Sequence, residues 1–350
     1  MAKLRKTLPK DFNEIVASGD AEKIKATLKK CEPNACFNNY CKESALMNPN
    51  LPEEVIKWLV TEYGADINYA NLYGCTALSE AAVSKPENLD LLVSLGAQVN
   101  FQKDDHPTAL IYAAMYYRVE GVKELLRLGA NVHMTGGYSH YNALEEALSR
   151  CQNANLPQMA EIAPILIEAG IEITDDMRNQ VTRIGNNFEF YRDSFAPDYL
   201  PVCDAGLREL YRIFDVTPVP HKRKYDGSAP ISVKAATWTQ QYNELWEQLV
   251  PGTGKAKFVQ GEVIRIAGRI RHEILDNGGM NWDADFRKMR DNLSVLMAGG
   301  KAVDDAILTK IKSVSPNVDE GILDEIAEAA VNWILANPDP IELGEVDYRR

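Results

Sequence analysis

The chain has 350 residues, a length that allows about two domains. Hydrophobic residues make up 45% and charged residues 25% of it, which excludes a wholly disordered or collagen-like chain. The 38 Lys and Arg residues are outnumbered by 50 Asp and Glu, so the net charge is −12. Direct nucleic-acid binding by the whole chain is therefore disfavoured, because phosphate contacts need a cationic face.

The cysteines and the hydrophobic runs bear on the cellular compartment. Six cysteines are too few for a disulfide scaffold in a chain of this length. The basic N-terminus is not followed by the apolar segment of a secretory signal. No apolar run approaches the roughly 20 residues that a membrane span needs. We therefore expect a cytoplasmic protein with reduced thiols and no membrane contact.

Two sequence patterns recur together in the first half of the chain, at intervals of about 33 residues. In the first pattern, an alanine follows a short polar segment. These alanines are Ala45, Ala77, Ala109 and Ala143, which are separated by 32, 32 and 34 residues. In the second pattern, a glycine follows an apolar run. These glycines are Gly64, Gly96, Gly129 and Gly170, which are separated by 32, 33 and 41 residues. Two patterns in phase indicate an internal repeat.

Each repeat has the pattern of two short helices. A Thr or Ser precedes the first apolar run, where its hydroxyl can cap a helix N-terminus. The first helix is predicted over Ala77–Val83 in one repeat and over Ala109–Tyr117 in the next. The second helix is predicted over Val119–Leu128, where Val122, Leu125 and Leu126 form one apolar stripe. Gly129 then ends that helix, because glycine adopts the left-handed conformation at little cost.

The segment Gly74–Ala82 follows the G-x-T-P-L-x-x-A-A pattern of the ankyrin repeat, and residues 11–216 resemble that family. The segment departs from the pattern at Ala77, where the family usually has Pro, and at Ser79, where it usually has His. The resemblance implies pairs of antiparallel helices with protruding β-turns, stacked into a solenoid. It also implies that the protein binds other proteins.

The ends of the repeat array depart from the regular pattern, as terminal repeats commonly do. Ile15–Leu28 is predicted to be an N-terminal half-repeat, and Asp176–Tyr191 with Ala205–Phe214 a C-terminal cap. The 41-residue interval before Gly170 predicts a longer loop near Cys151–Pro157.

Aromatic and acidic residues in the predicted tips, with two tyrosines of the third inner helix, form the candidate partner-binding site. Tyr112 and Tyr116 are four residues apart, so we expect them to share one side of their helix. Tyrosine is a rigid anchor with a polar end, although it can also simply pack between adjacent tips. The partner should then offer apolar pockets and a basic rim. The site comprises Tyr69, Tyr73, Phe101, Asp104, Asp105, Tyr112, Tyr116, Tyr138 and Tyr141.

A linker over residues 217–234 is predicted to separate the ankyrin-repeat domain, residues 1–216, from a helical domain at 235–350. Pro, Gly and charged residues together mark the linker. Its basic run over His221–Lys224 is a weak nucleic-acid signal, and a solvated linker is the favoured interpretation. The fold class is therefore all-α, an ankyrin solenoid followed by a helical domain.

The C-terminal domain is predicted to contain five helices. Gly261 and Gly268 lie seven residues apart on the second, which predicts that another helix packs closely there. The segment Leu245–Pro251, with Gln260-Gly261-Glu262 and Asn277-Gly278, resembles a helical domain of uncharacterised bacterial and phage proteins. The predicted helices are Thr237–Leu249, Lys255–Asp276, Trp282–Met297, Ala302–Val314 and Val318–Asn337.

Three patterns were weighed as chemical sites, and none is favoured over its structural alternative. Gly252–Ala256 lacks the first glycine and the hydroxyl of a phosphate-binding loop. The spacing of Cys31, Cys36 and Cys41 does not suit zinc, and free thiols are favoured. A polar stripe could form an acid–base or phosphate site but is more typical of a solvated or ion-paired face. It comprises Glu262, Arg265, Arg269, His272, Glu273 and Asp276.

The sequence thus predicts a non-catalytic protein-interaction module with no catalytic residue, cofactor or metal. Its partner is another, unidentified protein, and the C-terminal domain could add a second contact or a homo-oligomer interface. An inhibitor, immunity or anti-defence factor that occludes its partner is one specific hypothesis. Two alternatives remain open. One is an enzyme in the C-terminal domain, acting through Glu262, Arg269 or His272, with the repeats as targeting arm. The other is an acidic nucleic-acid mimic.

Overall fold

The fold, described by a computed structural model over residues 3–221 and 224–350, is mainly helical. Helices make up 54% of the chain and strands 4%, with sixteen α-helices in the described ranges. The chain divides into two compact units, which are described separately here. The N-terminal unit comprises residues 1–185 and 197–218, and the C-terminal unit comprises residues 186–196 and 219–350.

The N-terminal unit begins with two short helices and a two-stranded parallel sheet. Strand β1 (Arg5–Thr7) pairs with β2 (Cys31–Cys36), and helices α1 (Phe12–Ala17) and α2 (Ala21–Leu28) lie between them in the chain. Phe12 is fully buried. Helix α2 lies within the predicted half-repeat and α1 begins three residues before it, whereas the strands are an addition to the predicted all-α class.

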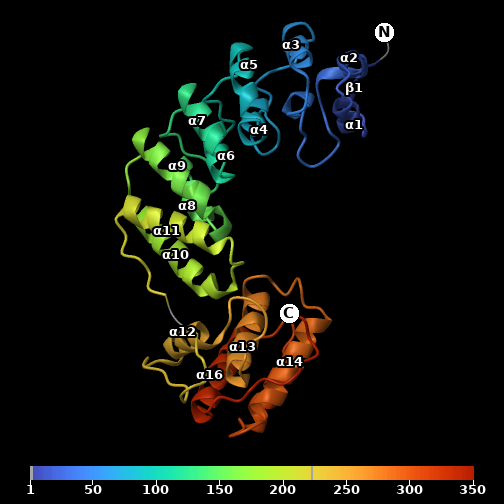
Figure 1. Ribbon diagram of the computed structural model, residues 1–350. Coiled ribbons are helices and arrows are strands. Elements are labelled where there is room, and N and C mark those ends of the chain that lie inside the picture. The colour runs from blue at the N-terminus through green and yellow to red at the C-terminus, as the bar shows by residue number, and fades with distance from the viewer. Residues whose placement is uncertain (1–2, 222–223) are drawn as a thin grey trace. The chain divides into compact units, whose positions relative to one another are not determined.

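Helix pairs then follow one another in chain order, as Figure 1 shows for α3 to α9. In each pair the first helix packs against the first helix of the neighbouring pair, so α6 lies between α4 and α8. Buried alanines such as Ala82, Ala114 and Ala147 allow this close approach. The pairs are η1 (Ala45–Met47) with α3 (Glu53–Thr61), α4 (Ala77–Ser84) with α5 (Leu89–Ser94), α6 (Ala109–Met115) with α7 (Val119–Arg127), and α8 (Ala143–Arg150) with α9 (Leu156–Glu168). A short 3-10 turn, η2 (Pro86–Asn88), precedes α5.

Side-chain caps begin three of the inner helices. The hydroxyls of Thr76 and Thr108 accept hydrogen bonds from backbone N–H groups three residues ahead, both at 3.3 Å. Asn142 accepts two such bonds at the start of α8. The first inner helix is only a 3-10 turn, because Pro49 keeps Asn48 extended, with ψ 113°. The predicted capping is therefore confirmed for the Thr positions.

The recurrent glycines end the outer helices as predicted. Gly64, Gly96, Gly129 and Gly170 have φ values of 79°, 102°, 92° and 115°. These values lie in the left-handed region, which side chains with a Cβ rarely adopt.

An asparagine in each of three successive repeats ties it to the next. The side-chain oxygens of Asn34, Asn68 and Asn100 accept hydrogen bonds from the backbone N–H groups of Asp66, Gln98 and Asn131, at 2.9, 2.9 and 2.7 Å. These bonds satisfy backbone groups that no helix could satisfy. The repeats are thus joined by a ladder of hydrogen bonds as well as by apolar packing.

The long interval before Gly170 extends a helix rather than a loop. Residues 151–155, which include the 3-10 turn η3 (Asn153–Asn155), separate α8 from α9, and α9 has 13 residues where α7 has nine. Met159, Ile162 and Leu166 bury the apolar side of the extra length. The predicted long loop near Cys151–Pro157 is therefore wrong.

Two longer helices end the array. Residues 175–185 of α10 (Asp175–Tyr191) belong to the N-terminal unit, as does α11 (Leu200–Phe214), which packs on α9. The remaining residues of α10 and the turn η4 (Arg192–Ser194) belong to the C-terminal unit.

In the C-terminal unit, helix α13 (Val259–Leu275) is central, because α12, α14 and α16 all pack against it. It begins four residues later than predicted, since Phe258 is extended and forms an antiparallel bridge with Glu342. The chain after α16 therefore returns alongside the start of α13. The remaining helices are α12 (Trp238–Leu249), α14 (Ala284–Met297), α15 (Asp305–Ser313) and α16 (Glu320–Ala336).

Close packing explains both glycines of α13. A Cβ at Gly261 would lie 2.8 Å from the carbonyl oxygen of Leu249 and 2.9 Å from the Cβ of Ala256. A Cβ at Gly268 would lie 2.5 Å from the Trp246 ring and would also meet the hydroxyl of Tyr242. The predicted close approach of another helix is confirmed, and that helix is α12.

Residues 225–235 contact the C-terminal unit through two backbone hydrogen bonds and one buried side chain. Ile231 is buried, and its N–H donates to the carbonyl of Pro338 at 2.8 Å. The N–H of Tyr225 donates to the carbonyl of Gln248 at 2.9 Å. The buried Ile231 thus attaches this stretch to the core of the C-terminal unit, whereas most of its other side chains are exposed. Within the predicted basic run, Lys222 and Arg223 lie outside the described residues.

Candidate partner-binding surface

Two exposed tyrosines from neighbouring loops contact each other at the tips of the first repeats. The rings of Tyr40 and Tyr73 are 5.9 Å apart between centroids, and the side chains are 75% and 48% exposed. A backbone hydrogen bond also joins the two loops, since the N–H of Leu72 donates to the carbonyl of Cys41 at 3.2 Å. Only Tyr73 was predicted as a site residue. The loop before Ala45 offers a signal for Tyr40, since an aromatic residue there parallels Tyr73 before Ala77.

A second tyrosine pair lies on the inner helix α6, with Tyr112 in the helix and Tyr116 as its C-cap residue. The rings of Tyr112 and Tyr116 meet edge to face, 4.9 Å apart between centroids, which confirms that they share one side of the helix. Tyr116 is 47% exposed, whereas Tyr112 is half-buried and donates to the carboxylate of Glu80 at 3.4 Å. Burial, followed by the neighbouring Cys75 and Glu80, raises the pKa of Tyr112. Tyr112 is therefore a neutral donor at ordinary pH.

An acidic hollow lies beside this pair. Burial, and then the charge of Glu43, raises the pKa of Glu80, while the hydrogen bond from Tyr112 lowers it. Glu43 and Glu80 both line a cavity of about 400 Å³, together with the apolar Phe37 and Met47. A cationic group in this cavity would be favoured, because it would offset the charge of Glu43 that raises the pKa of Glu80.

Three of the predicted aromatic residues are half-buried and partly structural. The Tyr69 hydroxyl donates to the carbonyl of Lys42 at 3.2 Å, which joins two tips. Tyr141 forms an antiparallel bridge with Gly136 within the fourth tip. Phe101 is half-buried in the third tip. For these three residues, packing between or within tips buries part of the aromatic side chain.

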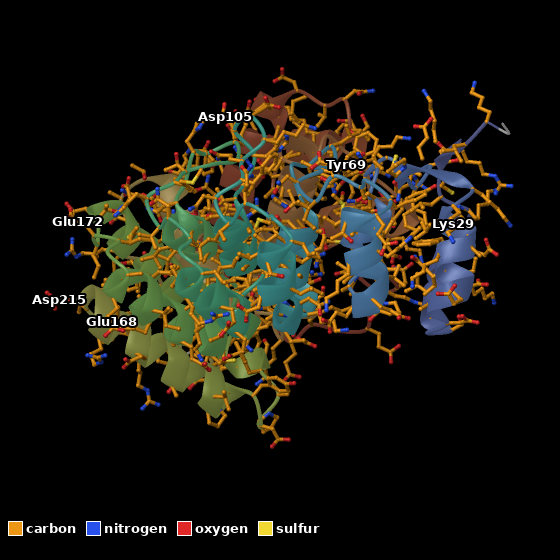
Figure 2. All side chains as sticks on the ribbon, turned by 90° about the horizontal axis from the view of Figure 1, so that it is seen from above. Lys29, Tyr69, Asp105, Glu168, Glu172 and Asp215 are labelled. Atoms are coloured by element: carbon orange, nitrogen blue, oxygen red, sulfur yellow. The ribbon has the colours of Figure 1, made fainter. Side chains whose placement is uncertain are left out.

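The remaining predicted residues are exposed on the tips. Tyr138 is fully exposed, and Asp104 and Asp105 are both exposed. The carbonyl of Asp105 accepts a hydrogen bond from Gly137 N–H at 2.6 Å, so the third and fourth tips touch. In Figure 2 the labelled Tyr69 and Asp105 lie on loops along the same edge of the repeats. The tips thus form one continuous edge that carries aromatic and acidic side chains.

The polar stripe of α13 contains the ion pairs Glu262–Arg265 and His272–Asp276, so the predicted ion-paired face is confirmed there, but its first pair is not solvated. Glu262 and Arg265 are buried, at 0% and 2% exposure. The other four members, Arg269, His272, Glu273 and Asp276, line a cavity inside the C-terminal unit, as do residues 252–254 of the predicted glycine-rich turn. The charge pattern could not reveal this burial, because the covering residues come from elsewhere in the chain.

The described residues contain neither a membrane-spanning helix nor a candidate metal site. No helix within 3–221 or 224–350 is long and apolar enough to cross a membrane. In the same ranges, no group of three or more His, Cys, Asp or Glu side chains is placed to hold a metal ion.

Capped inner helices, glycine-ended outer helices and tips joined by an asparagine ladder define a helical repeat protein. No family model matches the chain. An ankyrin repeat protein of Acanthamoeba polyphaga mimivirus is 31% identical over 140 residues, which cover 38% of this chain and 83% of the relative. The chain therefore belongs to the ankyrin repeat family.

Proposed function

We propose that this protein is a non-catalytic protein-binding module whose ankyrin solenoid, within residues 1–216, carries the recognition surface. The observation that supports the proposal best is the position of two tyrosine pairs, the exposed Tyr40 with Tyr73, and the half-buried Tyr112 with the exposed Tyr116. Exposed aromatic pairs on a rigid scaffold lose little conformational entropy on binding, and tyrosine is enriched among residues that dominate interface energies.

The chemistry of the surface specifies the partner that fits it. The tyrosines suit apolar pockets, and the hollow with Glu43 and Glu80 suits a Lys or Arg side chain of the partner. Asp104 and Asp105 add negative charge at the third tip. The partner is then a cytoplasmic protein with a basic, partly apolar surface.

The rest of the chain fits a role in occlusion. In this proposal residues 217–234 connect the repeats to a helical domain at 235–350, which provides a second contact with the partner or with another copy of the chain. A binder with two contact regions blocks a larger part of its partner than one region alone. This arrangement suits an inhibitor, including one of an immunity or anti-defence kind.

The test is affinity capture from the source cell's lysate with three forms of the full chain, quantified by mass spectrometry. The forms are wild type, the double variant Tyr73→Ala/Tyr116→Ala, and Tyr199→Ala. Tyr199 is 68% exposed but lies outside the tips and inner helices, so it controls for the loss of an exposed tyrosine. We expect the double variant to lose the partner by at least about tenfold, and Tyr199→Ala to retain it.

The outcomes separate the proposal from its alternatives. Equal capture by wild type and the double variant would contradict the aromatic surface. A partner whose binding weakens steeply with salt, and is insensitive to the tyrosines, would indicate a nucleic-acid mimic instead. Substrate turnover that is lost in His272→Ala, with the fold intact, would indicate an enzyme.

A further inference from the structure

The C-terminal unit contains a cavity of about 860 Å³ that the proposed function does not use. It is formed by α12, α13, the turn at residues 251–254 and Arg350. Figure 1 shows α12 and α13 side by side in this unit. The volume lies within the range of small-molecule sites. Its wall includes four arginines, namely Arg265, Arg269, Arg271 and Arg350.

Arg265 is held in place by a buried network. Its Nε and Nη2 donate to the two carboxylate oxygens of Glu262 at 2.8 and 2.6 Å. The same carboxylate accepts hydrogen bonds from the Tyr348 hydroxyl at 2.6 Å and from the Ala256 N–H at 2.9 Å. Burial raises the pKa of Glu262, but these hydrogen bonds and the charge of Arg265 outweigh burial and lower it overall. Glu262 is therefore ionised and fixes the guanidinium.

One donor of this fixed guanidinium has no partner. Nη1 of Arg265 is the single buried side-chain nitrogen or oxygen without a hydrogen bond in residues 3–221 and 224–350. Leaving a charged donor buried and unsatisfied costs free energy comparable to a lost charged hydrogen bond. Because Arg265 also lines the cavity, this donor indicates a ligand group that would satisfy it.

Arg269, one helical turn further on, supplies a cation without a carboxylate partner. It is half-buried and makes no hydrogen bond or ion pair with any residue that the structure describes. Burial, followed by the positive charges of Arg265 and Arg350, lowers the pKa of Arg269. The negative charge of Glu262 acts in the opposite direction but does not outweigh these effects.

The other charged groups of the wall are already paired. Arg271 contacts Asp324 at 3.1 Å and Arg350 contacts Asp283 at 2.7 Å. His272 contacts Asp276 at 2.7 Å.

Glu273, the remaining carboxylate of the wall, is also engaged. It accepts hydrogen bonds from the side chains of Asn277 and Asn281 and from the N–H of Asn281. Since Arg265 is paired with Glu262, Arg269 is the one arginine of the wall without a carboxylate partner in residues 3–221 and 224–350, and the fixed Arg265 contributes its free Nη1 donor.

An aromatic wall faces the same cavity. The rings of Tyr242 and Trp246 stack with centroids 6.3 Å apart and an interplanar angle of 22°. They rest on Gly268, whose missing side chain leaves room for them. Stacked aromatic surfaces beside arginines are the features with which proteins bind a planar base together with a phosphate.

From these features we propose that the cavity binds a phosphate-bearing small molecule of nucleotide size. Its phosphate group accepts hydrogen bonds from Arg269 and from the unpartnered Nη1 of Arg265, while its planar ring packs against Trp246 and Tyr242. Arginine forks match phosphate oxygens in geometry and charge. The site lies in the C-terminal unit and is independent of partner binding by the repeats.

The test is isothermal titration calorimetry of the full chain with ADP, pyrophosphate and adenosine. We expect pyrophosphate to bind, ADP to bind more tightly because of its ring, and adenosine to bind more weakly than either. Arg269→Gln should weaken ADP binding by at least about tenfold, and Arg269→Lys should retain part of it. Arg287→Gln, an exposed arginine of the same unit outside the cavity, should bind ADP like wild type.

The thermal stability of each variant shows whether it is folded, since Arg269 is only half-buried and its replacement should leave the core intact. Bound ADP should also raise the unfolding temperature of the C-terminal unit. The proposal is overturned if neither phosphate compound binds with a Kd below about 1 mM. It is overturned equally if folded Arg269→Gln binds ADP as wild type does. Equal affinities for pyrophosphate and ADP would contradict the proposed packing of the planar ring against Trp246 and Tyr242.

Discussion

At the scale of single residues, Glu262 is the common acceptor of a buried hydrogen-bond network in the C-terminal unit. It lies on the central helix and is fully buried, yet it is ionised because Arg265, Tyr348 and Ala256 all donate to it. Removing one partner of a buried ion pair is far more costly than removing an exposed pair, because the other charge stays buried without compensation.

We expect Glu262→Gln to lower the free energy of unfolding of the C-terminal unit by about 3–5 kcal/mol at neutral pH. The substitution keeps the shape of the side chain but leaves Arg265 without its counter-charge. Urea unfolding at pH 7, followed by tryptophan fluorescence, measures the effect. Four of the five tryptophans lie in this unit and only Trp58 lies in the other, so the fluorescence reports mainly on the C-terminal unit.

The same pair predicts how stability depends on pH. The folded pKa of Glu262 lies below its usual value of 4.5, so its stabilisation is complete above pH 4.5 and is lost as the pH falls through the folded pKa. The difference in stability between wild type and Glu262→Gln should therefore narrow as the solution is acidified. A difference that stays constant down to pH 3 would show that the charge of Glu262 contributes nothing.

At the scale of elements, local signals predicted where helices exist better than where they end. Thr76 and Thr108 cap the helices that follow them, and the recurrent glycines end the outer helices, because caps and stops depend on one or two neighbouring residues. The length of α9 was not predictable in the same way. Its extra residues are helical because Met159 and Ile162 find a core supplied by α11 and its neighbours.

The crossing of α7 with α4 provides a test at this scale. A Cβ at Gly121 in α7 would overlap the carbonyl oxygen of Ala82 in α4. In an exposed helix the change from Gly to Ala would stabilise by about 1 kcal/mol, but here the overlap dominates. We therefore expect Gly121→Ala to destabilise the N-terminal unit by about 1–3 kcal/mol, measured by chemical denaturation followed by circular dichroism.

A matched control exists for this substitution. Gly344 has an ordinary φ and nothing within 4 Å of the position that its Cβ would occupy. Gly344→Ala should therefore leave stability unchanged within about 0.5 kcal/mol. If Gly121→Ala proved as neutral as the control, or stabilising, the close contact between α4 and α7 would be refuted.

At the scale of the whole molecule, the two units have separate cores, so we expect them to unfold in separate transitions. Differential scanning calorimetry should resolve two, with Gly121→Ala lowering the temperature of one and Glu262→Gln that of the other. A single transition that both substitutions shift equally would show that the units unfold together.

The contacts in the candidate sites differ in how well the sequence alone predicts them. Tyr112 and Tyr116 could be paired from their spacing, because one helix carries both. Tyr40 could not be paired with Tyr73, since their contact depends on how two loops 33 positions apart lie against each other. The burial of Arg265 was equally hidden, because Tyr348 and the backbone of Arg350 cover it from more than 80 positions away.

The return of residues 338–350 to α13 has a consequence for the order of biosynthesis. A repeat can stack as soon as its neighbour has emerged from the ribosome, so the N-terminal unit assembles progressively during translation. Helix α13 instead emerges with Glu262 and Arg265 uncovered, and its polar network is completed only when Tyr348 has been made. The repeats are therefore available to meet a partner before the C-terminal unit has closed its core.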